Sequence, residues 1–213
     1  MHALVIGATG EIGKQLIPLL SSHEKISKVT AIVRSDIEHS LPKVTYQVID
    51  FAQLPSLSIP DTDVAFCCLG TTIKKAGSQQ AFEKVDLDYV AEFAQMVKKN
   101  GAKQFHVVSA SGANKTSFVF YNRVKGHMEE AIKKLAFDST YVYRPALLDS
   151  ERTEKRSGER VAIIVFRILN PLLRGRLKRF ASISTKKVAQ GMVDRIQQPE
   201  PGFHVIESES IYC

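Results

Sequence analysis

The chain has 213 residues, of which 44% are hydrophobic and 24% are charged, and its formal net charge is +7 at pH 7. This length and composition exclude a disordered chain and favour a single domain over residues 1–213 with one buried core. The positive charge favours anionic partners such as phosphorylated cofactors. No helix-turn-helix, zinc-finger or RNP motif accompanies that charge, so we expect no nucleic-acid partner.

The three cysteines, Cys67, Cys68 and Cys213, are odd in number and lack CxxC spacing. They predict neither a disulfide framework nor a zinc or other metal site, and they indicate a reducing compartment. The longest uncharged apolar run of the last third, residues 161–166, is too short to cross a bilayer. The first expected strand begins by Ala3, which leaves no room for a targeting peptide. We therefore expect a cytoplasmic protein with no integral membrane segment.

Strand and helix patterns alternate along most of the chain. Strands are expected over residues 3–6, 29–34, 44–49, 63–70, 104–109, 139–144 and 203–207. Helices are expected after the first strand and over residues 81–100, 121–135 and 185–197, with Gly101 as a C-cap. Because crossovers between parallel strands are right-handed, this order predicts an α/β fold with a doubly wound parallel Rossmann-type sheet and helices on both faces.

Residues 150–180 differ in character, because a polar stretch is followed by apolar residues with arginines every seven positions from Arg160. A helix would carry these arginines along one stripe, and Pro171 should end or kink it. We expect a small C-terminal cap over a substrate pocket, or a helix packed on the fold. The alternative is a basic surface over residues 160–180 that binds a protein partner or acidic lipids.

Three glycines, Gly7, Gly10 and Gly13, stand between the first expected strand and the first expected helix. Gly7 allows a sharp turn, Gly10 lets the backbone approach a pyrophosphate, and Gly13 lets the helix pack close to the strand. The N–H groups and the positive end of the helix dipole then face the phosphates. A glycine-rich turn in another α/β protein is the alternative, but the strand–helix context predicts a dinucleotide-binding loop.

The end of the second expected strand, where an acidic residue binds the adenosine ribose of NAD, holds Arg34. A guanidinium suits a 2′-phosphate, so we expect NADP(H); Asp36 would reverse this preference if the strand ended later. Asp50, after the third strand, could accept a hydrogen bond from the adenine amino group or form an Asx-turn. After the fourth strand, Gly70 lets the backbone pass close to the cofactor.

Tyr121 and Lys125 are four residues apart on an expected helix and therefore share one face. The Lys125 cation can lower the pKa of the Tyr121 phenol and can hydrogen-bond a nicotinamide ribose. Ser109, at the end of the fifth strand, could orient a carbonyl and stabilise its oxygen as hydride arrives. Ser111 is the alternative serine, and Ser109 is preferred for its spacing to Gly112 and Tyr121. These residues predict a catalytic site of Ser109, Tyr121 and Lys125.

Taken together, the motifs GATGEIG (7–13), CCLGTT (67–72), YNRVK (121–125) and RPALL (144–148) resemble the atypical branch of the short-chain dehydrogenase/reductase superfamily. FCCLGTT followed by VDLDYV (85–90) and SASGANK (109–115) resembles the Tat-interacting-protein family of NADPH-binding oxidoreductase-like proteins. The resemblance spans essentially the whole chain and implies a Rossmann sheet that binds NADPH. The implied cofactor contacts are Gly7, Thr9, Gly10, Glu11, Ile12, Arg34, Leu69, Thr71, Tyr121, Lys125, Pro145 and Leu148, with Arg156 as a further contact.

The chain departs from the superfamily pattern in two places. An asparagine on the fourth helix often relays protons in the superfamily, whereas this chain has Asp86, which could cap or salt-bridge the helix. Larger relatives also carry a sizeable C-terminal substrate domain, for which this chain offers only residues 150–180.

We therefore expect an NADPH-dependent carbonyl reductase, in which hydride passes to the carbonyl carbon of a small substrate and Tyr121 gives a proton to its oxygen. The alternative is an NADPH-binding regulatory module, in which the cofactor orders the loops and a partner protein binds that state. The Tyr121–Lys125 pair favours the enzyme, and the small substrate region and the basic segment favour the module.

Overall fold

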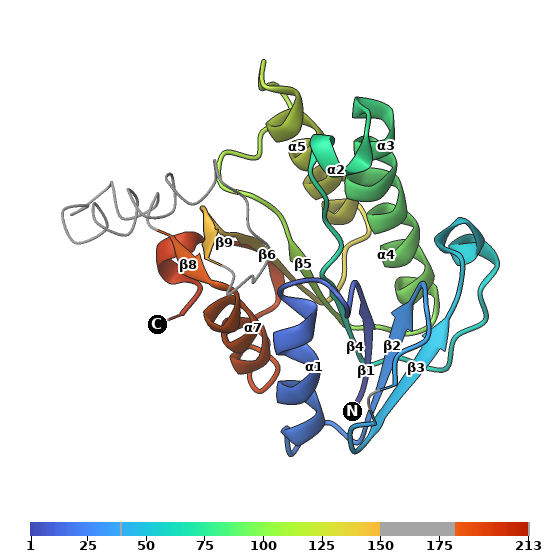
Figure 1. Cartoon of the computed structure of the whole chain (residues 1–213). Coiled ribbons are helices and arrows are strands. Elements are labelled where there is room, and N and C mark those ends of the chain that lie inside the picture. The colour runs from blue at the N-terminus through green and yellow to red at the C-terminus, as the bar shows by residue number, and fades with distance from the viewer. Residues whose placement is uncertain (39, 150–181, 213) are drawn as a thin grey trace.

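The computed structural model describes residues 1–38, 40–149 and 182–212. In this part of the chain, seven parallel strands form one sheet in the order β3-β2-β1-β4-β5-β6-β9 (Figure 1). The strands are β1 (His2–Ile6), β2 (Lys28–Val33), β3 (Val44–Val48), β4 (Val64–Cys67), β5 (Gln104–Val108), β6 (Ser139–Arg144) and β9 (Gly202–Glu207). The order of strands reverses between β1 and β4, which confirms the expected doubly wound sheet and marks the crevice where such folds bind ligands.

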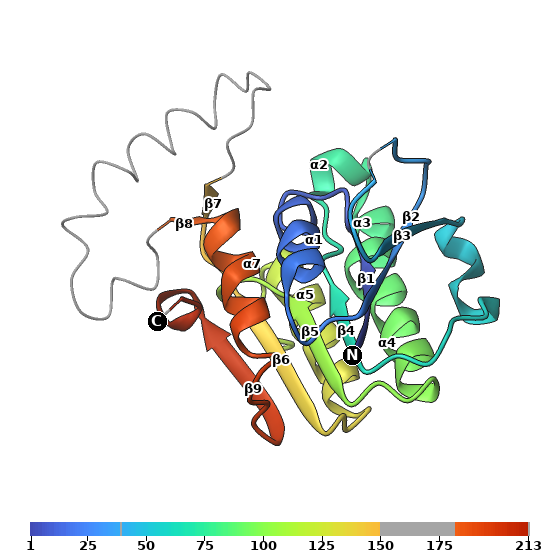
Figure 2. The same ribbon diagram turned by 90° about the horizontal axis from the view of Figure 1, so that it is seen from below.

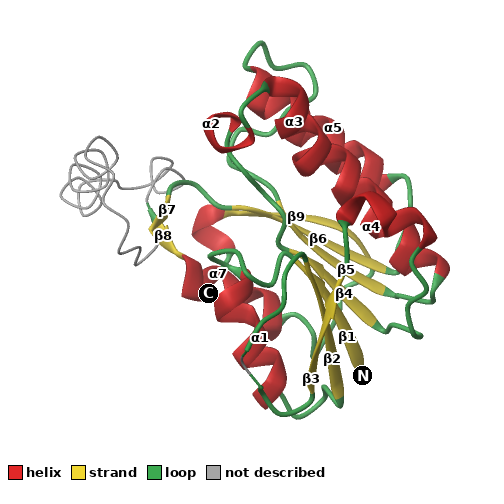
Figure 3. Ribbon diagram, turned by 45° about the vertical axis from the view of Figure 1, so that its right-hand side comes forward, coloured by secondary structure: helices red, strands yellow, loops and turns green. Residues whose placement is uncertain are grey.

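Helices cover both faces of the sheet (Figure 3). On one face lie α1 (Gly13–Ser22) and α7 (Thr185–Asp194), and on the other lie α4 (Tyr89–Lys99) and α5 (Phe120–Lys133). The shorter helical segments are η1 (Phe51–Ser56), α2 (Ile73–Ala76), α3 (Gln79–Glu83), the π-helical turn η2 (Lys84–Asp88) and η5 (Ser208–Ser210).

The central strand β1 shows why the sheet needs continuous apolar runs. Ala3 and Val5 belong to the core shared with α1 and α7, whereas Leu4 and Ile6 belong to the core shared with α4 and α5. All four side chains have 0% exposure. Successive residues of a strand point to opposite faces, so a strand covered on both faces must be apolar throughout.

The helix expected over residues 81–100 is interrupted. α3 continues into η2 and then into α4, so that one helical column contains a π turn. A π turn carries one residue more than an α turn. Within η2, Asp86 is turned inward and has 0% exposure. After the C-cap Asn100, Gly101 adopts φ +87°, as the expected glycine stop requires.

A separate two-stranded parallel sheet consists of β7 (Leu148–Asp149) and β8 (Ile183–Ser184) (Figure 2). The expected cap over residues 150–180, its basic stripe and Arg156 lie outside the described residues. Within the described ranges, none of the helices is long and apolar enough to span a membrane.

Candidate functional site

The glycine loop between β1 and α1 packs against the chain that leaves β4. Gly7 has φ +80°, and a Cβ at this position would lie 2.5 Å from the carbonyl carbon of Cys68. A Cβ on Gly13 would overlap the carbonyl oxygen of Gly7. Both positions therefore require glycine, because the loop lies against the backbone at the β1–β4 switch point.

The start of α1 carries no side-chain cap, since Ile12 stands at the N-cap position and makes no such hydrogen bond. The loop is closed by its own backbone: Gly10 N donates to Gly7 O at 3.0 Å, and Lys14 N donates to Gly10 O at 2.9 Å. Thr9 is exposed in this loop. A ten-residue helix that begins without a side-chain cap presents its first N–H groups and its positive dipole end to an anion.

Arg34 directly follows β2, which ends at Val33. Its side chain is exposed, and the guanidinium carbon lies 5.7 Å from the centre of the Phe51 ring. The carboxylate of Asp36 accepts a hydrogen bond from Ile37 N at 2.8 Å. The strand end therefore coincides with Arg34, and the aromatic ring supports the guanidinium.

The loops after β3 and β4 contain further expected contacts. Asp50 accepts a hydrogen bond from Ala52 N at 3.0 Å and caps η1, which is the Asx arrangement considered as the alternative to an adenine contact. After β4, Leu69 is buried, Gly70 is exposed and Thr71 is half-buried. The chain thus turns outward at Gly70, next to the glycine loop that Cys68 contacts.

α5 brings Tyr121 and Lys125 into contact with the α3–η2 segment. The Lys125 ammonium lies 2.7 Å from Oδ1 of Asp86, with the two side chains 3% and 1% exposed. The other carboxylate oxygen of Asp86 accepts a hydrogen bond from Thr71 N at 2.9 Å. The Tyr121 ring lies 5.3 Å from the Phe82 ring, measured between centroids. One buried carboxylate therefore joins the loop after β4 to the expected catalytic lysine.

The pKa of Tyr121 is raised, whereas the sequence predicts that the Lys125 cation lowers it. Burial raises the pKa of Tyr121; the Lys125 cation lowers it and the Asp86 carboxylate raises it, so that the pKa lies above its ordinary value. Burial lowers the pKa of Lys125, but Asp86 and the other neighbours outweigh burial and leave this pKa raised. At neutral pH the phenol keeps its proton and the ammonium keeps its charge.

Ser109 belongs to a different cluster. Its hydroxyl donates to Oε1 of Glu129 at 2.5 Å, and Glu129 is bound at both oxygens by Arg144, at 2.9 and 2.6 Å. Ser111 N donates to Pro145 O at 3.0 Å and ties the loop after β5 to the loop after β6. The structure brings Tyr121 and Lys125 together, and it joins the Ser109 hydroxyl to Glu129.

The remaining expected contacts lie past β6. Pro145 is buried, and Leu148 is half-buried in the short strand β7. A polar pocket of about 340 Å³ lies beside α5. Among the described residues, its lining consists of Ala113, Asn114, Lys115, Gly126, Glu129, Glu130 and Arg144, which includes none of the expected catalytic or cofactor residues.

Two functional candidates were missing from the expected site. The sequence marks Asp86 as a departure from the superfamily pattern and predicts a cap or a salt bridge for it, but it does not identify Lys125 as the partner. Glu129 lies four residues after Lys125. That spacing places it on the same buried face of α5 and could have identified it.

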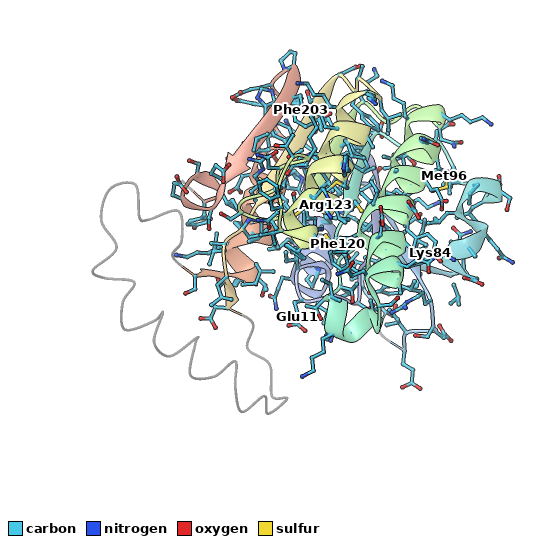
Figure 4. The ribbon with its side chains drawn as sticks, turned by 90° about the horizontal axis from the view of Figure 1, so that it is seen from above. Glu11, Lys84, Met96, Phe120, Arg123 and Phe203 are labelled. Carbon is cyan, nitrogen blue, oxygen red and sulfur yellow. The ribbon has the colours of Figure 1, made fainter. Side chains whose placement is uncertain are left out.

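In Figure 4, Glu11 marks the glycine loop, Phe120 and Arg123 mark the first turn of α5, and Lys84 marks η2, while Phe203 at the start of β9 lies on the opposite side of the view from Glu11. Arg123 lies with its guanidinium carbon 5.7 Å from the Phe120 ring centre. The glycine loop follows the carboxyl end of β1, and α5 contacts η2 through Lys125 and Asp86.

Residues 7–199 match the model of a family described as NAD(P)H-binding. Protein HTATIP2 of Rattus norvegicus is 40% identical over 163 residues, which cover 74% of this chain and 67% of the rat protein. The mitochondrial protein FMP52 of Candida albicans is 34% identical over 160 residues, which cover 72% of this chain and 70% of the fungal protein. These relatives confirm the resemblance to the Tat-interacting-protein family.

Solved structures share the fold at low sequence identity. MoeE5 in complex with UDP-glucuronic acid and NAD matches with a TM-score of 0.72 at 14% identity, over 97% of this chain and 75% of that protein. UDP-glucose 4-epimerase of Thermotoga maritima, solved with UDP-glucose, matches with a TM-score of 0.70 at 14% identity, over 97% of this chain and 77% of the epimerase.

The expected cytoplasmic location is wrong. The FMP52 proteins of Candida albicans, Eremothecium gossypii and Aspergillus fumigatus are all named mitochondrial. The expectation relied on three cysteines and an early first strand, and an odd cysteine count fits any reducing compartment.

The glycine loop at the β1–β4 switch point and the match over residues 7–199 agree with one another. This chain belongs to the NAD(P)H-binding family and has the Rossmann-type fold.

Proposed function

We propose that this protein is an NADPH-dependent oxidoreductase that reduces a small carbonyl compound. The observation that carries the proposal is the pair of half-buried Tyr121 and buried Lys125, where Asp86 joins Lys125 to the loop after β4. That loop in turn packs on the glycine loop at Gly7. The proposed phosphate-binding turn and the proposed proton donor are therefore linked through the loop after β4, at the switch point where folds of this kind have their ligand crevice.

The residues of this crevice fit a nicotinamide dinucleotide. Glycine at positions 7 and 13 lets the loop lie against the neighbouring backbone, and the start of α1, which has no side-chain cap, suits a diphosphate. The exposed Arg34 guanidinium suits the 2′-phosphate of NADPH. Asp50 is left out of the proposed set because its carboxylate caps η1. The proposed contacts are Gly7, Thr9, Gly10, Glu11, Ile12, Gly13, Arg34, Leu69, Gly70, Thr71, Tyr121, Lys125, Pro145 and Leu148.

A bound reduced nicotinamide would supply a hydride, and with it two electrons, to the carbonyl carbon. Tyr121 would donate its phenolic proton to the carbonyl oxygen as the C=O π bond breaks, and water would return a proton to the phenolate. Lys125 would hold the nicotinamide ribose. For the serine we propose Ser111, because the Ser109 hydroxyl already donates to Glu129.

The choice of cofactor is tested by calorimetry with NADPH and NADH. We expect Arg34→Ala to weaken NADPH binding about tenfold, through loss of a charge-assisted contact, and to leave NADH binding unchanged. Lys98→Ala is the matched control, because Lys98 is also a cation beside an aromatic ring, that of Phe137. Tighter binding of NADH than of NADPH by the unaltered protein would contradict the assignment.

The reaction is tested by NADPH oxidation with a panel of aldehydes, ketones and quinones. Tyr121→Phe should lower turnover by roughly 10²- to 10⁴-fold, as expected for loss of a general acid, with little change in NADPH affinity. Equal turnover by the Tyr121→Phe variant would contradict the proposed role.

A second candidate function is an NADPH-binding regulatory module that a protein partner recognises. One observation favours it: the polar groups of Lys125 and Ser109 are both engaged by carboxylates within the protein. Under this alternative, no member of the carbonyl panel is reduced, and NADPH binding changes the protection of the loops after β1 and β4 in hydrogen exchange.

A further inference from the structure

We propose that Asp86 is a positioning residue that fixes Lys125 and offsets its charge, so that Tyr121 keeps its proton and the site serves carbonyl reduction rather than alcohol oxidation. This inference deepens the proposed function. What it says about the direction of the reaction rests on that function. The arrangement of charges that it describes can be tested without any cofactor or substrate.

The geometry holds Asp86 in one position. η2 turns the carboxylate inward, where Oδ2 accepts a hydrogen bond from Thr71 N at 2.9 Å and Oδ1 lies 2.7 Å from the Lys125 ammonium. Lys125 also lies 3.5 Å from the carbonyl oxygen of Val108 at the end of β5. The lysine is thus held between two elements, and its charge is compensated within the protein.

The groups around Tyr121 and Lys125 come from α5, η2, α3 and β4. Tyr121 meets Lys125 on α5, Asp86 on η2 and the apolar Phe82 ring on α3. β4 contributes Cys67, whose thiol is uncharged because burial raises its pKa to about 12. The ammonium and the carboxylate together have no net charge, so a Tyr121 phenolate would gain little stabilisation from them in a dry site.

Protonation decides which direction Tyr121 can serve. Reduction of a carbonyl needs a phenol that donates a proton, whereas oxidation of an alcohol needs a phenolate that accepts one. A lysine without a partner would stabilise the phenolate and favour the second role. The Asp86 carboxylate removes that advantage and keeps the phenol protonated.

The experiment measures the pKa of Tyr121 in the cofactor-free protein by the ultraviolet absorbance of tyrosinate. The chain has six tyrosines, so each titration is repeated with Tyr121→Phe added and the difference gives Tyr121 alone. The variants are Asp86→Asn, which keeps an acceptor for Thr71 N, Lys125→Met, and the double variant. Glu129→Gln is the matched control, since it neutralises a buried carboxylate one helical turn away that pairs with Arg144.

Asp86→Asn should lower the pKa of Tyr121 by about one unit, because the lysine charge is no longer offset. The double variant and Glu129→Gln should leave it close to that of the unaltered protein, and Lys125→Met should raise it. If Asp86→Asn does not fold, the pKa of Tyr121 in Lys125→Met must still lie above its pKa in the double variant. An unchanged or raised pKa of Tyr121 in Asp86→Asn would overturn the inference. Equal pKa values of Tyr121 in Lys125→Met and in the double variant would also overturn it.

Kinetics separate this inference from the proposed function. If carbonyls are reduced, the loss of turnover at high pH should begin about one unit lower in Asp86→Asn than in the unaltered protein. If no carbonyl is reduced but the titrations follow the expected order, the proposed reaction is wrong and the role of Asp86 in holding the Tyr121 proton stands. Turnover with an unmoved pH profile in Asp86→Asn would reject that role alone.

Discussion

Two ion pairs lie one turn apart on α5 and differ in their surroundings. Lys125 pairs with Asp86 where the side chains are 3% and 1% exposed, whereas Glu129 pairs with Arg144 where they are 8% and 21% exposed. The first pair joins the proposed catalytic face to the loop after β4. The second joins α5 to the ends of β5 and β6. Because Coulomb interactions strengthen as water is excluded, the same helix face carries one charge pair suited to chemistry and one suited to anchoring.

The largest expected effect comes from breaking the dry pair. Lys125→Met leaves the Asp86 carboxylate buried without its counter-charge and should lower the free energy of unfolding by about 4 kcal/mol, as measured by urea denaturation. Adding Asp86→Asn should restore much of this loss, because the variant then buries two neutral side chains. A loss below about 1 kcal/mol in the single variant would show that the pair is not dry.

A third buried group, His106, sharpens the comparison because it is surrounded by rings. Its ring stacks on Phe66 with a centroid distance of 4.6 Å, and Nδ1 lies 3.0 Å from the hydroxyl of Tyr143. Burial, with a smaller contribution from Arg195, lowers the pKa of His106 from 6.5 to about 3. The histidine must therefore be neutral in the fold, unlike the two charged pairs.

This shift makes stability depend on pH in a known direction. Between pH about 6.5 and about 3 the unfolded chain binds the proton and the fold does not, so stability falls as the pH falls. The expected loss is about 2 kcal/mol between pH about 7.5 and about 5, from urea denaturation at both values. His106→Phe should remove most of that loss, and an equal loss in the variant would assign it to other groups.

Breaking the wetter pair should cost less. Arg144→Met removes both hydrogen bonds to Glu129, but the carboxylate keeps the Ser109 hydroxyl and partial contact with water. We expect the free energy of unfolding to fall by about 2 kcal/mol, about half the effect of Lys125→Met. Urea denaturation of the two variants side by side checks this order, and a larger loss in Arg144→Met would reverse the comparison.

The smallest expected effect concerns the two serines. Ser109→Ala removes one hydrogen bond to a carboxylate that Arg144 still holds, and should lower the free energy of unfolding by about 1 kcal/mol. Ser111→Ala should reduce carbonyl turnover more than Ser109→Ala does. The opposite ranking in NADPH oxidation would return the catalytic role to Ser109.

Much of the sheet is predictable from the sequence. β6 has the predicted bounds, and β1 and β3 differ from prediction by one residue. For β1 the reason is that a strand covered on both faces needs an unbroken apolar run. The positions of the glycine loop and of Arg34 are also predictable, because each directly follows the end of a strand, β1 and β2 respectively. The strands β7 and β8 have two residues each and are too short to show a hydrophobic pattern in the sequence.

The side-chain partners of the site were less predictable. Spacing places Ser109 at the end of β5, but it does not state that its hydroxyl points to Glu129. Hydrophobic periodicity predicts one helix over residues 81–100, because short windows on either side of the π turn each show the helical period. The pairing of Asp86 with Lys125 depends on that extra residue.

The π turn η2 therefore has a consequence for how this chain tolerates insertions and deletions. Because a π turn carries one residue more than an α turn, deleting one residue from η2 would convert it into an α turn and move the residues within it relative to α4. Asp86 would swing away from Lys125 although no partner had been substituted. The charge balance of the site is thus encoded in the number of residues along this helix as well as in their identity.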